Sequence, residues 1–156
     1  MATIASLHLY PVKSCRGLDL EAASLGPRGL EAHGLGDRQW AVVDAAGSVL
    51  TQREHPALAL VAPSPVAGGL ALAAPGMPSF EVSSTAGQAG TRAEIWGDTV
   101  QAVDAGAQAA ARLSAFLGVP ARLVRCDDRA QRPSEPRRTG PVEALNRCSA
   151  GYPLLL

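Results

Sequence analysis

The stretch LHLYPVKSCRG, residues 7–17, joins the start of a β-strand to a compact run of reactive side chains. Leu7 and Leu9 alternate with other residues as in a half-buried strand. Pro11 has no backbone N–H to donate, so the strand must end, bulge or lie at a sheet edge there. A lysine, a serine, a cysteine, an arginine and a glycine follow. Backbone N–H groups and cations can converge in such a loop, which is typical of anion binding. An ordinary solvated loop is the alternative for this stretch taken alone.

Three further strings occur downstream in a fixed order. GDRQWAVVD occupies residues 36–44, LTQREHP residues 50–56 and AEIWGD residues 93–98. Together with YPVKSCRG at residues 10–17, they resemble the N-terminal β-barrel domain of MOSC-type molybdenum-cofactor proteins. This family includes the mitochondrial amidoxime-reducing components and their bacterial relatives. The resemblance extends over nearly the whole chain, from Ile4 to Leu156.

The resemblance implies a cofactor-binding site made of three residues. In the family, the lysine and serine of the first string and the arginine of the second contact the molybdopterin, chiefly its phosphate. These positions are Lys13, Ser14 and Arg38 here. Arginine suits a planar, two-pronged grip on phosphate, and lysine adds a point charge. The alternative is two unrelated surface loops, with Arg38 paired to Asp37 or Asp44.

Composition restricts the class of protein. A chain of 156 residues is one domain, or one piece of a larger protein. Its 14 lysines and arginines balance 14 acidic residues, so no net charge attracts nucleic acid or an anionic membrane. No apolar run approaches the roughly 20 residues of a membrane span, and no secretory signal is recognisable. Sixteen glycines and 12 prolines favour short strands and turns over long helices.

Turn signals recur at roughly 8–12-residue spacing, which is typical of an antiparallel sandwich or barrel. One helix is expected at 105–117, with Asp104 as its N-cap and Gly118 and Pro120 at its end. We therefore predict a mainly β fold, a small antiparallel β-barrel with one capping α-helix as a lid. Turns are predicted at 44–47, 63–65 and 97–98. Strands are predicted at 2–12, 18–24, 30–33, 39–43, 48–53, 58–61, 69–73, 80–83, 92–96, 100–103 and 121–126.

The cysteines and histidines indicate neither a disulfide framework nor a metal site. Cys15, Cys126 and Cys148 are odd in number and widely spaced, which fits a reducing cytoplasm and leaves Cys126 and Cys148 without an evident partner. Cys15 is interpreted as a packing residue rather than a reactive thiol, since the family takes its molybdenum thiolate from a cysteine beyond Leu156. The three histidines share no metal-ligand spacing. They are His8, His33 and His55.

Composition and resemblance together divide the chain into three parts. Residues 1–126 are predicted to be the MOSC N-terminal β-barrel domain. Residues 127–150 are rich in arginine and proline and are predicted to be a mobile linker. Residues 151–156 are predicted to begin a truncated catalytic MOSC core.

The resemblance implies that the intact parent is a molybdenum-dependent oxidoreductase, with molybdopterin as cofactor, that reduces N-hydroxylated or similar small substrates. Its partners would be the C-terminal MOSC core in cis and an electron-donor protein or appended iron–sulfur domain, with no nucleic acid and no membrane. We expect a cytoplasmic protein whose present fragment carries no catalytic residue, holds no cofactor and is inactive alone. The alternative is a non-catalytic β module that binds a phosphorylated small molecule or a protein strand.

Overall fold

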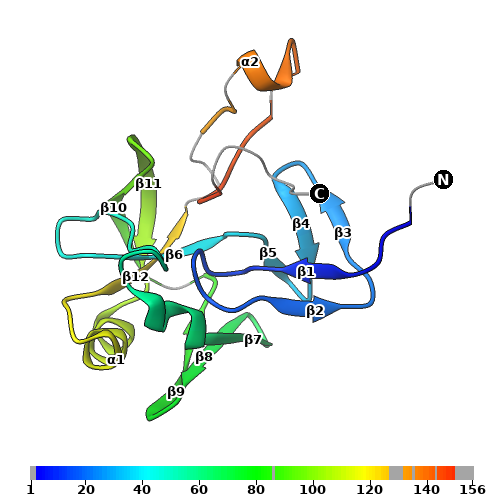
Figure 1. Cartoon of the computed structure of the whole chain (residues 1–156). Coiled ribbons are helices and arrows are strands. Elements are labelled where there is room, and N and C mark those ends of the chain that lie inside the picture. Colours follow the sequence, from blue (N-terminus) through cyan, green and yellow to red (C-terminus); the bar gives the residue numbers. More distant parts are fainter. Residues whose placement is uncertain (1–2, 86, 127–131, 135, 143, 150–156) are drawn as a thin grey trace.

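The computed structural model describes residues 3–85, 87–126, 132–134, 136–142 and 144–149. The strands form four antiparallel sheets, in the orders β1–β2, β3–β4–β5, β7–β8–β9 and β10–β11–β12–β6 (Figure 1). The strands are β1 Leu7–Leu9, β2 Leu18–Leu20, β3 Ser24–Gly26, β4 Gly29–Ala32, β5 Leu35–Gly36, β6 Trp40–Val43, β7 Ala62–Val66, β8 Gly69–Ala74, β9 Met77–Ser83, β10 Gln88–Ile95, β11 Asp98–Asp104 and β12 Arg122–Cys126. The helices are a 3₁₀-helix η1 Pro56–Leu60, α1 Ala107–Leu117 and α2 Pro136–Thr139.

The mainly β prediction is confirmed, but the closed barrel is wrong. The sheets are separate in the part of the chain that the structure describes. Most strands are short and pair with their neighbours in sequence; the exception is β6, which pairs with the distant β12. Isolated bridges link Val12, which follows β1, to Trp40 of β6, and Ser48, which follows β6, to Glu94 of β10. Helix α1 packs against β12 and β9 rather than over the mouth of a barrel (Figure 1).

Strand β6 lies at the centre of the core, because both of its faces are covered. Trp40 and Val42 point into the larger hydrophobic cluster, which includes Leu123 of β12. Ala41 and Val43 belong to a second cluster on the opposite face. All four residues of β6 are fully buried. Alternation of side chains across a strand explains why neighbouring residues enter different clusters.

The predicted hairpin through residues 44–47 forms, although its second arm is short. The Asp44 N–H donates to the Ser48 carbonyl over 2.9 Å, and the Leu50 N–H donates to the Val42 carbonyl over 2.8 Å. Gly47 has a φ of 94°. A Cβ at this position would also lie 2.8 Å from the carbonyl oxygen of Arg92, so the turn requires glycine.

Two predictions fail where prolines were interpreted only as breakers. The strand predicted at 58–61 is the 3₁₀-helix η1, which begins at Pro56; the fixed φ of proline is compatible with the first position of a helix. The turn predicted at 63–65 is strand β7. Residues two apart direct their backbone nitrogens to the same side, so an edge strand can carry Pro63 and Pro65 with both nitrogens facing away from β8.

Helix α1 begins two residues later than predicted and ends where predicted. Asp104 is the last residue of β11, and Gly106 occupies the N-cap. The Asp104 carboxylate still accepts a hydrogen bond from the Gly106 N–H over 2.8 Å. Gly118 ends the helix in the left-handed conformation, as predicted. Ala109 and Leu113 are the helix residues that are fully buried.

The segment predicted to be a mobile linker contains ordered contacts in the residues that the structure describes. Pro133 and Leu145 form a β-bridge, so the segment returns along itself. Its buried polar residues are Arg132, Ser134, Asn146, Arg147 and Ser149. The domain boundaries proposed above stay predictions, and residues 151–156 lie outside the described part. Within the described ranges, no helix is both long and apolar enough to cross a membrane.

Candidate anion-binding site

Backbone pairing brings the two predicted cofactor-binding strings together. The Arg38 N–H donates to the Tyr10 carbonyl over 2.6 Å, and the Trp40 N–H donates to the Pro11 carbonyl over 2.9 Å. In return the Lys13 N–H donates to the Trp40 carbonyl over 2.8 Å. Pro11 needs only its carbonyl in this pairing, which explains why a proline is tolerated here. Lys13 and Arg38 are therefore on adjacent segments despite their separation in sequence.

Lys13 is the only lysine in the chain, and it is buried. Its side chain lies over the indole ring of Trp96, with Nζ 5.3 Å from the ring centroid. Among the described residues, no carboxylate forms an ion pair with it. The pKa of Lys13 is lowered from 10.5 to about 8, mainly by burial and also by the nearby Arg38 and Arg132, while Asp37 acts in the opposite direction. A buried cation beside other cations is an environment that an anion would stabilise.

Arg38 has one carboxylate partner. Its guanidinium forms an ion pair with buried Asp37 and stacks over the ring of Tyr10, 5.1 Å from the centroid. Asp37 also accepts a hydrogen bond from the Tyr10 N–H over 2.9 Å. The Arg38–Asp37 ion pair, which the sequence analysis gave as the alternative to phosphate binding, is thus present. It does not consume the arginine, because a guanidinium carries five N–H donors.

Ser14 follows Lys13 in an unusual backbone conformation. Its φ is 65°, and its carbonyl accepts a hydrogen bond from Gln52 Nε2 over 2.8 Å. Four described non-glycine residues have positive φ, and three of them are Ser14, Arg38 and Trp96. Each such residue costs of order 1 kcal/mol or more, and such strain tends to cluster at functional sites. The site is therefore built partly from backbone that the surrounding structure must hold in place.

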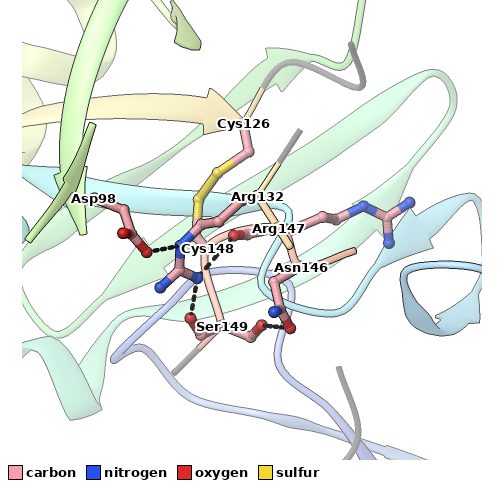
Figure 2. The surroundings of a disulfide bond; sticks show 7 residues. All are labelled: Asp98, Cys126, Arg132, Asn146, Arg147, Cys148 and Ser149. Carbon is pink, nitrogen blue, oxygen red and sulfur yellow. Dashed lines mark hydrogen bonds and ion pairs between the residues drawn. A yellow bond between two sulfur atoms is a disulfide. The ribbon is translucent and has the colours of Figure 1, made fainter. Parts of the chain in front are cut away.

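Arg132 is a further cation near the site that the sequence does not predict. Its side chain is 8 % exposed. Nε pairs with Asp98 Oδ2 at 2.8 Å, and one terminal nitrogen donates to the carbonyls of Ser149 (2.6 Å) and Arg147 (3.4 Å) (Figure 2). It lies in the segment that we interpreted as a linker. Because its position depends on where that segment folds back, no spacing in the sequence indicates it.

Residues 1–120 match the family described as the MOSC N-terminal beta barrel domain. The chain belongs to this family. The predicted family is thereby confirmed.

Relatives of this MOSC N-terminal domain are longer proteins. It is 37 % identical to a molybdenum cofactor sulfurase of Danio rerio over 79 % of its own length and 15 % of the relative's. It is 28 % identical to the mitochondrial amidoxime-reducing component 1 of Xenopus laevis over 86 % of this chain and 40 % of that protein. For the mitochondrial amidoxime reducing component 2 of Bos taurus the identity is 33 %, over 80 % of this chain and 38 % of that protein. The chain thus spans less than half the length of each.

A solved structure resembles part of this MOSC domain. The solution structure of a Bordetella bronchiseptica protein superposes with a TM-score of 0.50 at 32 % sequence identity. The match covers 56 % of this chain and 70 % of that one.

The residues of this MOSC domain fit the phosphate end of a molybdopterin but offer no metal thiolate. Lys13 and Arg38 are cations on adjacent segments, and cations of this kind suit a phosphate. Cys15 packs in the larger core cluster, as predicted, and burial raises the pKa of its thiol to about 12. The Cys15 side chain is buried among apolar residues, where a metal-bound cofactor cannot reach it. The described residues contain no group of three metal-ligating side chains.

The other two cysteines were predicted to have no partner, and this prediction is wrong. Cys126, at the end of β12, and Cys148 form a disulfide with their Cα atoms 6.4 Å apart (Figure 2). The sequence indicates no partner for either, because nothing in the residues between them predicts that the chain folds back. The disulfide removes the argument from cysteine number for a reducing compartment. The Cys148 N–H donates to the Arg38 carbonyl over 3.0 Å, so the disulfide anchors a segment that supports the site.

Two surface depressions, each of about 370 Å³, flank the turn between β10 and β11. Trp96 and Gly97 contribute to one of them, and Gly97, Asp98 and Arg132 to the other. Trp96 is 53 % exposed. The turn therefore presents an aromatic face to solvent beside the buried ammonium of Lys13.

Proposed function

We propose that this MOSC domain binds the phosphate of a molybdopterin through Lys13, Ser14 and Arg38. The observation that carries the proposal is the buried Lys13 ammonium, which lies near Arg38 and has no ion pair with a carboxylate among the described residues. The names of the relatives, a molybdenum cofactor sulfurase and amidoxime-reducing components, support the choice of cofactor. When bound, the cofactor would supply the redox chemistry.

Each residue has a distinct part in this binding. Lys13 supplies a charge that is little screened by water, because burial lowers the local dielectric constant. Arg38 can grip two phosphate oxygens with the donors that Asp37 does not use. Ser14 adds a hydroxyl beside Lys13. The Trp96 ring stabilises the ammonium in its charged form and excludes water from one side of it.

The catalytic part of the protein would lie outside this domain. No described cysteine is suited to hold molybdenum, because Cys15 is buried among apolar side chains and the other two form a disulfide. We therefore propose a C-terminal MOSC core in cis, with its own cysteine ligand, in an intact cytoplasmic oxidoreductase. Its substrates would be N-hydroxylated or similar small compounds, and a separate protein or an appended iron–sulfur domain would deliver electrons. This chain alone should be inactive.

The non-catalytic alternative rests on the same cations. Any small molecule that carries a phosphate monoester presents the same charge to Lys13 and Arg38. Pairing with a protein strand would involve residues 151–156, which lie outside the described part of the chain. The phosphate-binding step is common to both functions, so it is tested first.

The test is a titration of the ¹⁵N-labelled chain with inorganic phosphate at constant ionic strength, followed by NMR. We expect saturable shifts at the amides of Lys13, Ser14 and Arg38. Arg38→Ala should weaken binding by about 1.5–3 kcal/mol, the usual contribution of a hydrogen bond to a charged group. Arg92→Ala, which removes an exposed arginine of β10, is the matched control and should bind like the unchanged chain.

Two results would contradict the proposal. One is the absence of saturable shifts around Lys13, and the other is an equal loss of affinity in the Arg92→Ala control. The position of the catalytic centre is tested separately, by metal analysis of the chain purified from cells that make molybdopterin. Stoichiometric molybdenum, or reduction of an N-hydroxylated compound by the chain alone, would show that the centre lies within it.

A further inference from the structure

Arg132 joins the two parts of the molecule that hold the anion-binding site together. On one side its Nε pairs with Asp98, two residues after the Trp96 ring that underlies Lys13. On the other side it donates to the carbonyls of Arg147 and Ser149. These carbonyls flank Cys148, whose N–H donates to the Arg38 carbonyl. Figure 2 shows the Arg132 guanidinium between Asp98 and Ser149.

We propose that Arg132 is a further anion-binding residue, the third cation of the site formed by Lys13 and Arg38. The proposal rests on the proposed function, because it concerns the same anion. The segment that carries Arg132 is fastened to β12 by the Cys126–Cys148 disulfide. The disulfide would therefore hold the third cation at the site.

The charge balance around Arg132 separates a binding role from a purely structural one. Its carboxylate partner, Asp98, is 57 % exposed, so water screens that ion pair. The positive charge is meanwhile close enough to lower the pKa of buried Lys13. A structural hydrogen-bond donor does not need a charge that repels its neighbour. An anion with two negative charges would turn this repulsion into attraction from all three cations.

Two variants of opposite expected effect test the proposal by titration with inorganic phosphate. Arg132→Gln keeps amide donors but removes the charge, and we expect phosphate to bind about tenfold more weakly or worse. Asp98→Asn removes the carboxylate that competes for Arg132, and we expect tighter binding. A structural role predicts the reverse for Asp98→Asn, since the lost ion pair would leave Arg132 less well positioned. Because Asp98 is exposed, this variant should fold even if Arg132→Gln does not.

The second readout is the pKa of Lys13 without phosphate, measured with ¹³C-labelled lysine. The chain contains only this lysine, so a single side-chain signal reports it. Arg132→Gln should raise the pKa, while Arg38 continues to lower it. Arg147→Gln is the matched control, because it removes another buried arginine of the same segment that pairs with Glu31 instead. It should leave both the pKa and the phosphate affinity unchanged.

The outcomes distinguish the two proposals. If the unchanged chain binds no phosphate, the proposed function and the role of Arg132 both fail. If the chain binds phosphate but Asp98→Asn binds it equally or more weakly, the role of Arg132 fails alone. An unchanged Lys13 pKa in folded Arg132→Gln would also overturn it.

Discussion

Lys13→Met should make the chain more stable while it removes phosphate binding. Methionine keeps an unbranched apolar side chain of similar length in the same buried position, so packing is largely retained. It removes a charge that the folded chain holds close to Arg38 and Arg132. The free energy of unfolding should therefore rise at neutral pH, in the direction opposite to most core substitutions.

The magnitude follows from the pKa of Lys13, which is lowered from 10.5 to about 8. Each pKa unit corresponds to about 1.36 kcal/mol, so the charged lysine destabilises the fold by about 3 kcal/mol at most. Between pH 8 and 10.5 the unfolded chain keeps a proton that the folded chain has released. The stability of the unchanged chain should therefore rise with pH across this window. Lys13→Met lacks this rise, so its advantage should be full below pH 8 and shrink above it.

At higher pH, ionisation of Cys15 changes the free energy of unfolding in the opposite direction. Burial raises the pKa of its thiol from 9.0 to about 12, so above pH 9 the unfolded chain loses a proton that the folded chain keeps. This contribution lowers stability as the pH rises from 9 towards 12. It is common to the chain and its Lys13→Met variant, so it cancels in their difference.

The assay is urea unfolding of both proteins at pH 7 and pH 9.5 in buffers without phosphate. We expect the stability difference to be larger at pH 7. A stability difference that does not depend on pH, or a destabilised Lys13→Met variant, would refute the inference that burial and nearby cations make the charged Lys13 destabilising. The same variant, titrated with inorganic phosphate at pH 7, should show no saturable binding. Retained affinity would refute the role of Lys13 in the anion site.

Two further predictions concern the fold around the site. Gly69→Ala should destabilise the chain by several kcal/mol, because the added Cβ would lie 2.0 Å from the backbone oxygen of Val82 in the β8–β9 pairing; a thermal midpoint close to that of the unchanged chain would contradict this register. Reduction of the Cys126–Cys148 disulfide should lower the free energy of unfolding by about 3 kcal/mol, as expected for a loop of this length. Thiol counting checks the pairing first, since three titratable thiols in the unfolded, unreduced chain would show that the disulfide is absent.

Much of the local structure could be predicted from the sequence, because it depends on neighbouring residues. The hairpin after Val43 and the end of helix α1 at Gly118 follow from turn and cap chemistry, which acts over a few positions. The alternation of buried Phe80 and Val82 with exposed neighbours along β9 is a local property as well. The strings around Lys13 and Arg38 identified the family, and with it the expectation that these two residues meet.

The tertiary structure alone decided how these elements combine. Short strands that satisfy their hydrogen bonds within separate sheets need not close into a barrel, and no local pattern tells which outcome occurs. Residues of the presumed linker fold back beside β6, and this return pairs Cys126 with Cys148 and places Arg132 near the site. The lowered pKa of Lys13 likewise depends on burial and on charges from distant segments. Contacts of this kind depend on packing between remote parts of the chain, whereas sequence periodicity describes only which face of an element is apolar.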